Sequence, residues 1–505
     1  MTATRTTARP VPFGAELRTL AFVVAAGAMM TFLDSTIINV AITSLVRGFH
    51  TSLSTIQWVL TGYGLSLSMI IPVTGWAVDR LGAKTAWIAS LVVFIVGSVL
   101  CGAAWNVTAL IVFRVIQGIG GGMILPIGQI MLARTAGPDR MARAMGAAAI
   151  PAMLGPVLGP VLGGLIVDDL SWRWIFFVNV PLCALALVLA VKLLPRDSGP
   201  GRVPARLDGR GLMLLAPGLT LLMYGLSQVG ADLVRPWIWV AAGAAFVAAY
   251  VFHTRWIETP LVSVRVFACR AFAVSSTAMF VYLVAVYGFM VVLPVYFQVL
   301  RGESPLNAGL LLVPLAIGGG LSMAVSGRLA DQVSARWIIV AGMVTVAAGA
   351  VMFTRLGPGA SLPMVIGALS VISLGHGAIL PPAMGSAYQG MPRREIPPAT
   401  ATFNVIFRLS SSFGTALLAV VLQDAIFDRA RVSSLADAAH LHGAQARAAL
   451  TSAFADSFWW VAVIAVLAAV PALFIPARKG AVSMQTLLSP GVESPADRPS
   501  VMARD

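Results

Sequence analysis

The sequence predicts an all-α protein that is built into a membrane through fourteen transmembrane helices. Of its 505 residues, 58% are hydrophobic and only 11% are charged, and the mean hydropathy is +0.88. Soluble domains, by contrast, are about one quarter charged. The charges are also unevenly distributed. The stretches 86–113 and 272–300 contain no Asp, Glu, Lys or Arg, and each exceeds the roughly 20 residues that a helix needs to cross a bilayer.

Apolar runs and the residues that interrupt them define the fourteen predicted spans. They cover 18–42, 54–77, 86–104, 108–131, 143–167, 174–194, 211–229, 236–256, 272–298, 306–327, 337–354, 362–385, 399–423 and 454–475. An even number of spans places both termini on one side of the membrane. If that side is the cytoplasm, 24 of the 34 Lys and Arg residues lie on the cytoplasmic side, 8 on the outer side and 2 within spans. Because basic residues concentrate in cytoplasmic loops, we expect both termini in the cytoplasm.

An internal repeat divides the chain into two halves. The segment Gly75 to Lys84 (GWAVDRLGAK) recurs 252 residues later as Gly327 to Arg336 (GRLADQVSAR). Each copy follows the second helix of a possible six-helix bundle, and parallel repeats of this kind are a hallmark of secondary transporters. The sequence therefore predicts two pseudo-symmetric six-helix bundles separated by two extra linker helices.

The predicted segments follow from this division. They are a cytoplasmic N-terminal segment (1–17), an N-terminal bundle (18–194), a basic cytoplasmic loop (195–210), two inserted helices (211–256), a cytoplasmic connector (257–271), a C-terminal bundle (272–476) with an external loop (424–453), and a disordered cytoplasmic tail (477–505).

Composition also argues against other classes of protein. The net charge of +14 comes from basic residues that punctuate the apolar runs, so we expect no nucleic-acid partner. The three cysteines are isolated and lack CxxC spacing, which predicts neither a metal site nor a disulfide framework. The sequence contains no GxxxxGK[ST] phosphate-binding loop, so nothing points to ATP as the energy source. We expect neither a cofactor nor an enzymatic activity.

Several motifs resemble those of one transporter family. They are Leu33–Ala41 (LDSTIINVA), Gln57-Trp58 with Tyr63, the loop Gly75–Lys84, Arg114–Gly120 (RVIQGIG), Gly155–Gly164, Ser171–Pro181 (SWRWIFFVNVP), and Phe403-Asn404 with Arg408. Through them the chain resembles the major facilitator superfamily, in particular its fourteen-helix drug:proton antiporters of the EmrB and QacA type. The resemblance extends over about residues 20–475. It implies the major facilitator fold, a multi-pass location in the cell membrane, and a small molecule and protons as partners. It is compatible with a monomer and leaves an accessory periplasmic partner open.

Asp34 is the main candidate for proton coupling. It is the only one of the 20 acidic residues that lies well inside a predicted span, and a charge at bilayer depth costs roughly 2.5–3.5 kcal/mol. Burial disfavours an ionised carboxylate whereas a nearby cation favours it, so protonation can switch. A structural carboxylate held by hydrogen bonds is the alternative. Arg114, in the fourth span, is the second candidate, because the resemblance implies that it communicates with the protonation site. The sequence leaves its direct partner open.

Two further groups are candidates for conformational change. Gly155, Gly159 and Gly163 recur every four residues, a spacing that lets a neighbouring helix approach closely. With Pro160 and Gly164 they form the antiporter motif, which we interpret as a gate and a seal between the halves, or else as ordinary packing. The second group is a cytoplasmic loop latch that comprises Gly75, Asp79, Arg80, Gly82, Lys84, Asp331 and Arg336.

Polar and aromatic residues in several spans are candidates for a substrate cavity. They are Asn39, Trp58, Tyr63, Gln117, Tyr282, Tyr287, His376, Asn404 and Arg408. For Trp and Tyr the alternative is an anchor at the membrane interface, and for His376 it is a packing hydrogen bond. Arg408, the second intramembrane cation, either lines the cavity or bonds facing carbonyls.

The sequence therefore predicts export of a small, lipophilic drug or natural product in exchange for protons, by alternating access. One alternative is an importer or exchanger of a small organic anion, with Arg114 and Arg408 as counter-charges. The Gly155–Gly164 motif argues against it, because that motif accompanies antiport in the superfamily. The other alternative is a non-transporting membrane sensor, which would need neither the paired loops nor a buried carboxylate.

Overall fold

The computed structural model describes residues 14–194, 207–229, 235–257, 260–430 and 444–476, which form helices joined by short turns. Most of the predicted N-terminal segment, the basic loop, the middle of the predicted external loop and the predicted tail lie outside these residues. The prediction of an all-helical membrane protein is confirmed, because twelve of the described helices are long and apolar enough to cross a bilayer. A further bent pair raises this number to thirteen.

The N-terminal half begins with α1 and ends with α7. Its helices are α1 (Ala15–Phe49), α2 (Leu53–Ile70), α3 (Val73–Leu81), α4 (Ala83–Gly102), α5 (Val107–Asp169), α6 (Trp174–Phe177) and α7 (Asn179–Leu193). The bent pair is α2 with α3, which meet at an angle of 56°. Gly137 breaks α5 with a φ of 68°, a conformation that suits glycine because it has no Cβ. We call residues 107–136 the first arm of α5 and residues 138–169 the second arm.

The two arms of α5 run past α1 in opposite directions. An ideal Cβ on Gly128 of the first arm would lie 2.6 Å from Val24, and one on Gly163 of the second arm would lie 2.9 Å from the carbonyl oxygen of Ile37. The second arm contains the predicted span 143–167 and lies beside α1, but it is not among the twelve spans. The total of fourteen spans therefore stays a prediction.

The rest of the chain forms the inserted pair and the C-terminal half. The inserted helices are α8 (Gly209–Ser227) and α9 (Arg235–His253). The C-terminal half comprises η1 (Val264–Ala268), α10 (Arg270–Val295), η2 (Tyr296–Leu300), α11 (Pro305–Leu311), α12 (Val313–Leu329), α13 (Ala335–Thr354), α14 (Leu362–Ala387), η3 (Arg393–Glu395), α15 (Ile396–Ala430) and α17 (Ala444–Ala472).

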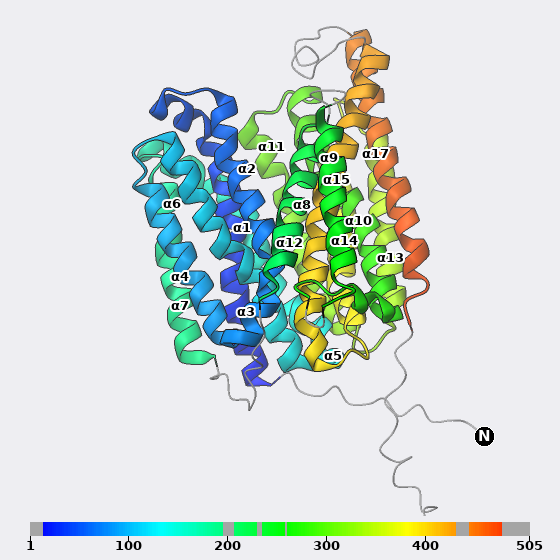
Figure 1. Cartoon of the computed structure of the whole chain (residues 1–505). Helices are drawn as coiled ribbons and strands as arrows, with labels where there is room; N and C mark the ends of the chain where they lie inside the picture. Colours follow the sequence, from blue (N-terminus) through cyan, green and yellow to red (C-terminus); the bar gives the residue numbers. More distant parts are fainter. Residues whose placement is uncertain (1–13, 195–206, 230–234, 258–259, 431–443, 477–505) are drawn as a thin grey trace, which may run out of the picture.

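The two halves stand side by side in Figure 1, with α8 and α9 in front of the C-terminal half. We call the face where α1 begins and α17 ends the proximal face, and the opposite face the distal face. Helix α8 contacts both halves. The ring of Tyr224 on α8 stacks on Trp58 of α2 at 5.8 Å, and Leu215 and Leu219 of α8 share a buried cluster with Val405 of α15.

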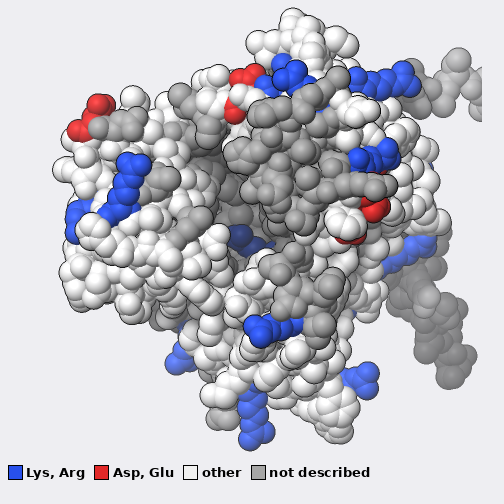
Figure 2. Space-filling model, turned by 90° about the horizontal axis from the view of Figure 1, so that it is seen from above, with Lys and Arg blue, Asp and Glu red and all other residues white. Residues whose placement is uncertain are grey.

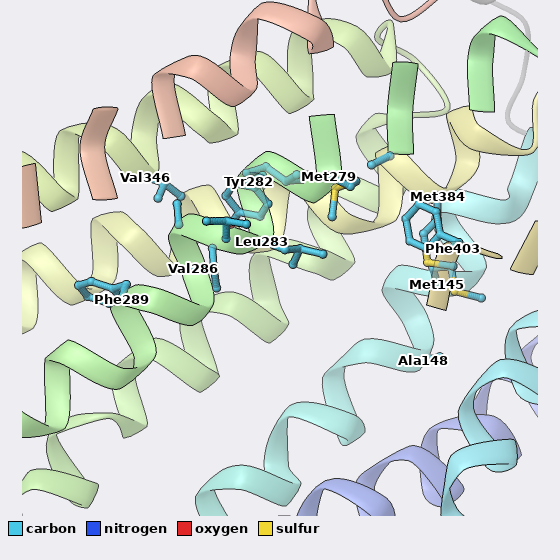
Figure 3. Packing of buried hydrophobic residues seen from close by; sticks show 14 of the residues in the cluster. Met145, Ala148, Met279, Tyr282, Leu283, Val286, Phe289, Val346, Met384 and Phe403 are labelled. Carbon is cyan, nitrogen blue, oxygen red and sulfur yellow. The ribbon is translucent and has the colours of Figure 1, made fainter. Parts of the chain in front are cut away.

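Close contacts join the halves near the proximal face. An ideal Cβ on Gly146 of α5 would lie 2.4 Å from the carbonyl oxygen of Met323 on α12. Figure 3 shows Met145 of α5 beside Met384 of α14 and Phe403 of α15. The distal face, in contrast, is hollowed between two lobes (Figure 2). The halves are therefore packed together on the proximal side of a hollow that opens to the distal face.

Candidate functional site

Asp34 and Arg114 form a direct ion pair inside the N-terminal half. Asp34 lies on α1 and is 1% exposed, and Arg114 lies on the first arm of α5 and is fully buried. Arg114 Nη1 donates to Asp34 Oδ2 over 2.9 Å. The partner of Arg114 that the sequence left open is thus the predicted proton-coupling carboxylate itself.

The other carboxylate oxygen is held by two side-chain amides. Asp34 Oδ1 accepts from Gln117 Nε2 over 2.9 Å and from Asn179 Nδ2 over 2.7 Å. Ser98 Oγ accepts from the same two amides, over 3.1 Å and 3.2 Å, and donates to the Phe176 carbonyl oxygen over 2.8 Å. We call Asp34, Arg114, Gln117, Asn179 and Ser98 the carboxylate network. Because α1, α4, α5 and α7 all contribute to it, the position of Asp34 depends on how four helices pack.

The guanidinium of Arg114 is partly satisfied without a second carboxylate. Its Nη1 also donates to Gln117 Oε1 over 2.8 Å, and its Nε donates to the Val59 carbonyl oxygen over 3.4 Å. Its carbon Cζ lies 3.9 Å from the ring centre of Tyr63, a distance at which an aromatic face attracts a cation. Nη2 is buried and has no acceptor among the described residues. Arg114 therefore depends on Asp34 for most of its charge compensation.

Two glycines allow the helices to come close enough for this network. An ideal Cβ on Gly97 of α4 would lie 2.6 Å from the Gln117 Cα, and one on Gly118 of α5 would lie 1.9 Å from Ser66 Oγ of α2. A side chain at either position would push α4 or α2 away from α5. Small residues at helix contacts are typical of membrane proteins, where close packing stabilises helix pairs.

The antiporter motif packs against the part of α1 that carries Asp34. An ideal Cβ on Gly155 would lie 2.5 Å from the Met29 carbonyl oxygen. A Cβ on Gly159 would lie 2.0 Å from Thr36 Oγ1, and one on Gly163 would lie 2.9 Å from the Ile37 carbonyl oxygen. Gly164 faces open space, with no described atom within 4 Å, and the side chain of Pro160 lies outside the described residues. In this conformation the glycines contact their own half of the protein, so a seal between the halves stays a prediction.

The first copy of the loop motif makes contacts mainly within the N-terminal half. Asp79 Oδ1 accepts from Arg134 Nη2 over 3.0 Å, and Lys84 Nζ donates to the carbonyl oxygens of Val191 and Leu194 over 2.9 Å and 2.6 Å. Gly82 ends α3 with a φ of 89°, and Arg80 is exposed. An ideal Cβ on Gly75 would lie 3.6 Å from the backbone of Pro397, in the other half.

The second copy contacts the opposite half instead. Asp331 Oδ2 lies 3.8 Å from Arg143 Nη1 on α5, and Gly327 faces the Ala142 carbonyl oxygen. Arg336 donates to the Leu473 carbonyl oxygen over 3.4 Å and stacks on Trp337. The two copies match in sequence, but Asp79 pairs with Arg134 of its own half, whereas Asp331 lies near Arg143 across the interface in this conformation.

The predicted cavity residues divide into separate groups. Tyr63 and Gln117 belong to the surroundings of Asp34, and Tyr282 Oη lies 2.7 Å from His376 Nδ1 in the C-terminal half. At the interface between the halves, Asn404 donates to Gln129 Oε1 over 2.7 Å. Tyr287 and Arg408 lie near each other within the C-terminal half, where the Tyr287 ring packs on Phe407.

Two predicted cavity residues lie elsewhere. Trp58 stacks on Tyr224 of the inserted helix α8, and Asn39 is exposed on α1. Trp58 is thus an aromatic contact to α8, which a single sequence does not distinguish from a cavity wall.

A small, partly open pocket lies within the C-terminal half. It is lined by Val286, Phe289, Met290, Leu315, Val346, Ile372, His376 and Val461. His376 is its single polar wall residue and is held by Tyr282 on another side. Figure 3 shows Tyr282, Val286, Phe289 and Val346 in this region.

Sequence reasoning missed two members of the carboxylate network, Ser98 and Asn179. Both are polar residues inside otherwise apolar spans and are fully buried. Asn179 also lies in the Ser171–Pro181 motif, so a signal for it was present. Among the described residues, no group of three or more His, Cys, Asp or Glu side chains is placed to hold a metal ion.

Comparisons with known proteins agree with this fold. A family model described as Major Facilitator Superfamily matches residues 24–415. The chain is 34% identical over 402 residues to the multidrug resistance protein B homolog of Mycobacterium tuberculosis, which covers 78% of this chain and 74% of that one. It is 29% identical over 342 residues to the putative multidrug resistance protein MdtD of Klebsiella pneumoniae, at 67% and 72% coverage.

Solved structures share the fold at low sequence identity. The proton:xylose symporter XylE, bound to 6-bromo-6-deoxy-D-glucose, matches with a TM-score of 0.62 and 16% identity over 92% of this chain and 96% of that one. The human organic anion transporter MFSD10 (TETRAN) matches with a TM-score of 0.59 and 15% identity over 91% of this chain and all of that one. At such identities the likeness concerns the fold alone.

These matches show a multi-pass protein of the cell membrane that transports small molecules, is not an enzyme and works without a cofactor. The chain belongs to the major facilitator superfamily, as a member of its drug:proton antiporter family.

Proposed function

We propose that this protein is a proton-coupled antiporter that exports a small, lipophilic drug or natural product by alternating access. The proposal includes fourteen spans, both termini in the cytoplasm and hence a cytoplasmic proximal face. The observation that carries it is the carboxylate of Asp34, which is buried inside an apolar span. It accepts one hydrogen bond from the Arg114 guanidinium and two from side-chain amides. The names of the relatives, which refer to multidrug resistance, support the class of cargo.

The geometry gives protonation of Asp34 a mechanical consequence. Ionised Asp34 compensates Arg114, and Arg114 has no other carboxylate partner among the described residues. A proton on Asp34 removes that compensation and leaves a buried guanidinium, which is costly unless it finds a new partner or water. Protonation therefore favours a conformation in which Arg114 or its surroundings have moved.

Coupling follows if cargo and proton favour opposite conformations, because a ligand shifts an equilibrium only by its difference in affinity between the two states. The hollow on the distal face and the packed proximal side correspond to an outward-facing state (Figure 2). We propose that Asp34 takes up a proton from the outside in this state and releases it to the cytoplasm in the other. The proximal contacts of Asp331 and Gly146 then break and re-form in each cycle.

The alternative function, import of an anion, requires both Arg114 and Arg408 as free counter-charges, and one of them is not free. Arg114 is already paired with Asp34 at 2.9 Å, so only Arg408 is available to an anion in this conformation. Direction of transport is tested with the same vesicles as coupling, because inverted vesicles should accumulate an exported compound.

The test uses inverted membrane vesicles with an imposed pH gradient and a fluorescent compound such as a fluorescein ester. Asp34→Asn should abolish gradient-driven accumulation while keeping exchange of labelled for unlabelled drug, because the amide retains the shape but cannot lose a proton. Asp424→Asn is the matched control, since Asp424 is exposed, and it should behave as wild type. Full gradient-driven accumulation in Asp34→Asn would exclude the proposed coupling.

A further inference from the structure

Arg408 lies on the interface between the halves, well inside the bilayer. It is twelve residues after the start of α15 at Ile396, which corresponds to about 18 Å along the helix. Residues four apart share a helix face, and Asn404, four residues earlier, donates to Gln129 of the opposite half. Arg408 therefore lies on the face of α15 that looks toward the N-terminal half, one turn on the distal side of the Asn404 contact.

The guanidinium of Arg408 differs from that of Arg114 in having no partner. Arg408 is partly exposed, and no carboxylate or hydrogen-bond acceptor pairs with it among the described residues. Tyr287 of α10 is within electrostatic range, and its ring packs on Phe407. An arginine at this depth is costly unless water or an anion compensates it, so its charge is available to a ligand.

The structure describes no unpaired acidic side chain at this interface that could compensate Arg408. Asp34 is fully engaged by Arg114, and the other acidic residues that the structure describes near the interface, Asp79 and Asp331, pair with Arg134 and Arg143 at the proximal end. Figure 2 shows basic atoms deep inside the hollow of the distal face. The middle of the interface is therefore electropositive, which attracts anions and repels cations.

Aromatic side chains lie next to this charge. The ring of Tyr287 on α10 packs on Phe407, the residue before Arg408, with ring centres 5.6 Å apart, and both side chains are partly exposed. A molecule with an acidic group and an aromatic body would thus find a guanidinium and aromatic rings at adjacent positions.

We propose that Arg408 binds an anionic group of the cargo, so that this exporter prefers amphiphilic acids, such as carboxylates or sulfonates, over lipophilic cations. This inference rests on the proposed function and narrows its substrate class. Arginine suits the task because its planar guanidinium binds such groups through two parallel hydrogen bonds and stays charged in apolar surroundings. In the outward-facing state the site is open to the distal side, where the cargo would leave.

The test measures equilibrium binding of two xanthene dyes of similar size, the anion fluorescein and the cation rhodamine 123, to the purified protein in lipid nanodiscs by fluorescence anisotropy. Wild-type protein should bind fluorescein about tenfold more tightly than rhodamine 123, and Arg408→Gln should weaken fluorescein binding about tenfold, as expected for loss of a charge-assisted hydrogen bond. The fluorescein affinity of Arg408→Lys should lie between those of wild type and Arg408→Gln. Arg47→Gln removes an equal charge from an exposed position and should bind like wild type.

Four results would overturn the proposal: no binding of fluorescein, equal binding of the two dyes, a preference of wild type for rhodamine 123, or an unchanged fluorescein affinity in Arg408→Gln. The dye preference of wild type decides the matter even if Arg408→Gln fails to fold, which size-exclusion chromatography would show. Binding is measured without a pH gradient, so it does not depend on whether Asp34 couples transport to protons. A failed coupling test and a failed binding test are therefore distinguishable.

Discussion

Asn179 donates a hydrogen bond to the Asp34 carboxylate over 2.7 Å, the shortest of the three that this carboxylate accepts. It approaches Oδ1, whereas Arg114 approaches Oδ2. Asp34 is therefore stabilised on one side by a cation and on the other by neutral amides. A neutral donor holds the carboxylate without forming an ion pair, so Asn179 can position Asp34 separately from Arg114.

Asn179→Ala should weaken gradient-driven transport. Asp34 Oδ1 would keep only the Gln117 amide, and Ser98 Oγ would lose one of its two donors, so the carboxylate would be held less firmly beside Arg114. Removing one partner of a buried hydrogen bond costs about 1–3 kcal/mol, which thermal unfolding in detergent should report, and drug accumulation in inverted vesicles at a fixed gradient measures the loss of transport. Asn39→Ala on α1, the helix of Asp34, is the control, because Asn39 is exposed. Wild-type stability and accumulation in Asn179→Ala would show that this contact does not hold Asp34 in place.

Gly159→Ala and Gly164→Ala form a matched pair within the antiporter motif. A methyl group at Gly159 would lie 2.0 Å from Thr36 Oγ1, two residues from Asp34, whereas one at Gly164 meets no described atom within 4 Å. Gly159→Ala should therefore destabilise the protein by about 1–3 kcal/mol, as overpacking does, and should reduce gradient-driven transport. Gly164→Ala should retain the stability and the gradient-driven transport of wild type.

Thermal unfolding in detergent and vesicle transport check this pair. Equal effects of the two substitutions would mean that the close approach of α5 to α1 is not what the motif provides. Loss of transport without loss of stability in Gly159→Ala would instead favour the predicted gating role over packing.

The sequence was sufficient to predict an all-helical membrane fold and to identify Asp34 as an acid inside a span. Long charge-free stretches identify spans because a membrane has no water to solvate side chains or backbone, and Asp34 is conspicuous as a single acid inside one. Its contacts with Gln117 and Asn179 could not be predicted, because they join residues 83 and 145 positions apart and depend on how four helices pack.

The pairing of the loop aspartates and the position of Trp58 could not be predicted either, because they depend on the conformation and on the direction of the side chains. The two loop copies have equivalent sequences, but Asp79 pairs within its half and Asp331 pairs across the interface, a difference that no motif contains. Trp58 faces α8 because the inserted helix lies against α2, and an aromatic residue near a helix end gives no indication of that neighbour. Whether a residue lines the cavity is therefore decided by tertiary packing.

Gly146→Val should prevent the halves from closing at the proximal face. The carbonyl oxygen of Met323 lies 2.4 Å from the position of a Cβ at Gly146, so any side chain there displaces α12 from α5. Overpacking of about 1–3 kcal/mol against this conformation would raise the population of the opposite one about tenfold or more. A cysteine at Met384, which is 2% exposed beside this contact, should then react faster with a membrane-impermeant maleimide (Figure 3).

The measurement uses inverted vesicles and a background in which Cys101, Cys183 and Cys269 are replaced by serine, so that only the introduced thiol reacts. Gly367→Val is the control, because a Cβ at Gly367 has no described atom within 4 Å. If Gly146→Val left the labelling rate unchanged, or if Gly367→Val raised it equally, the contact between α5 and α12 would not hold the proximal side closed. Faster labelling in Gly146→Val alone would also place the proximal face on the cytoplasmic side, because inverted vesicles expose that side to the reagent.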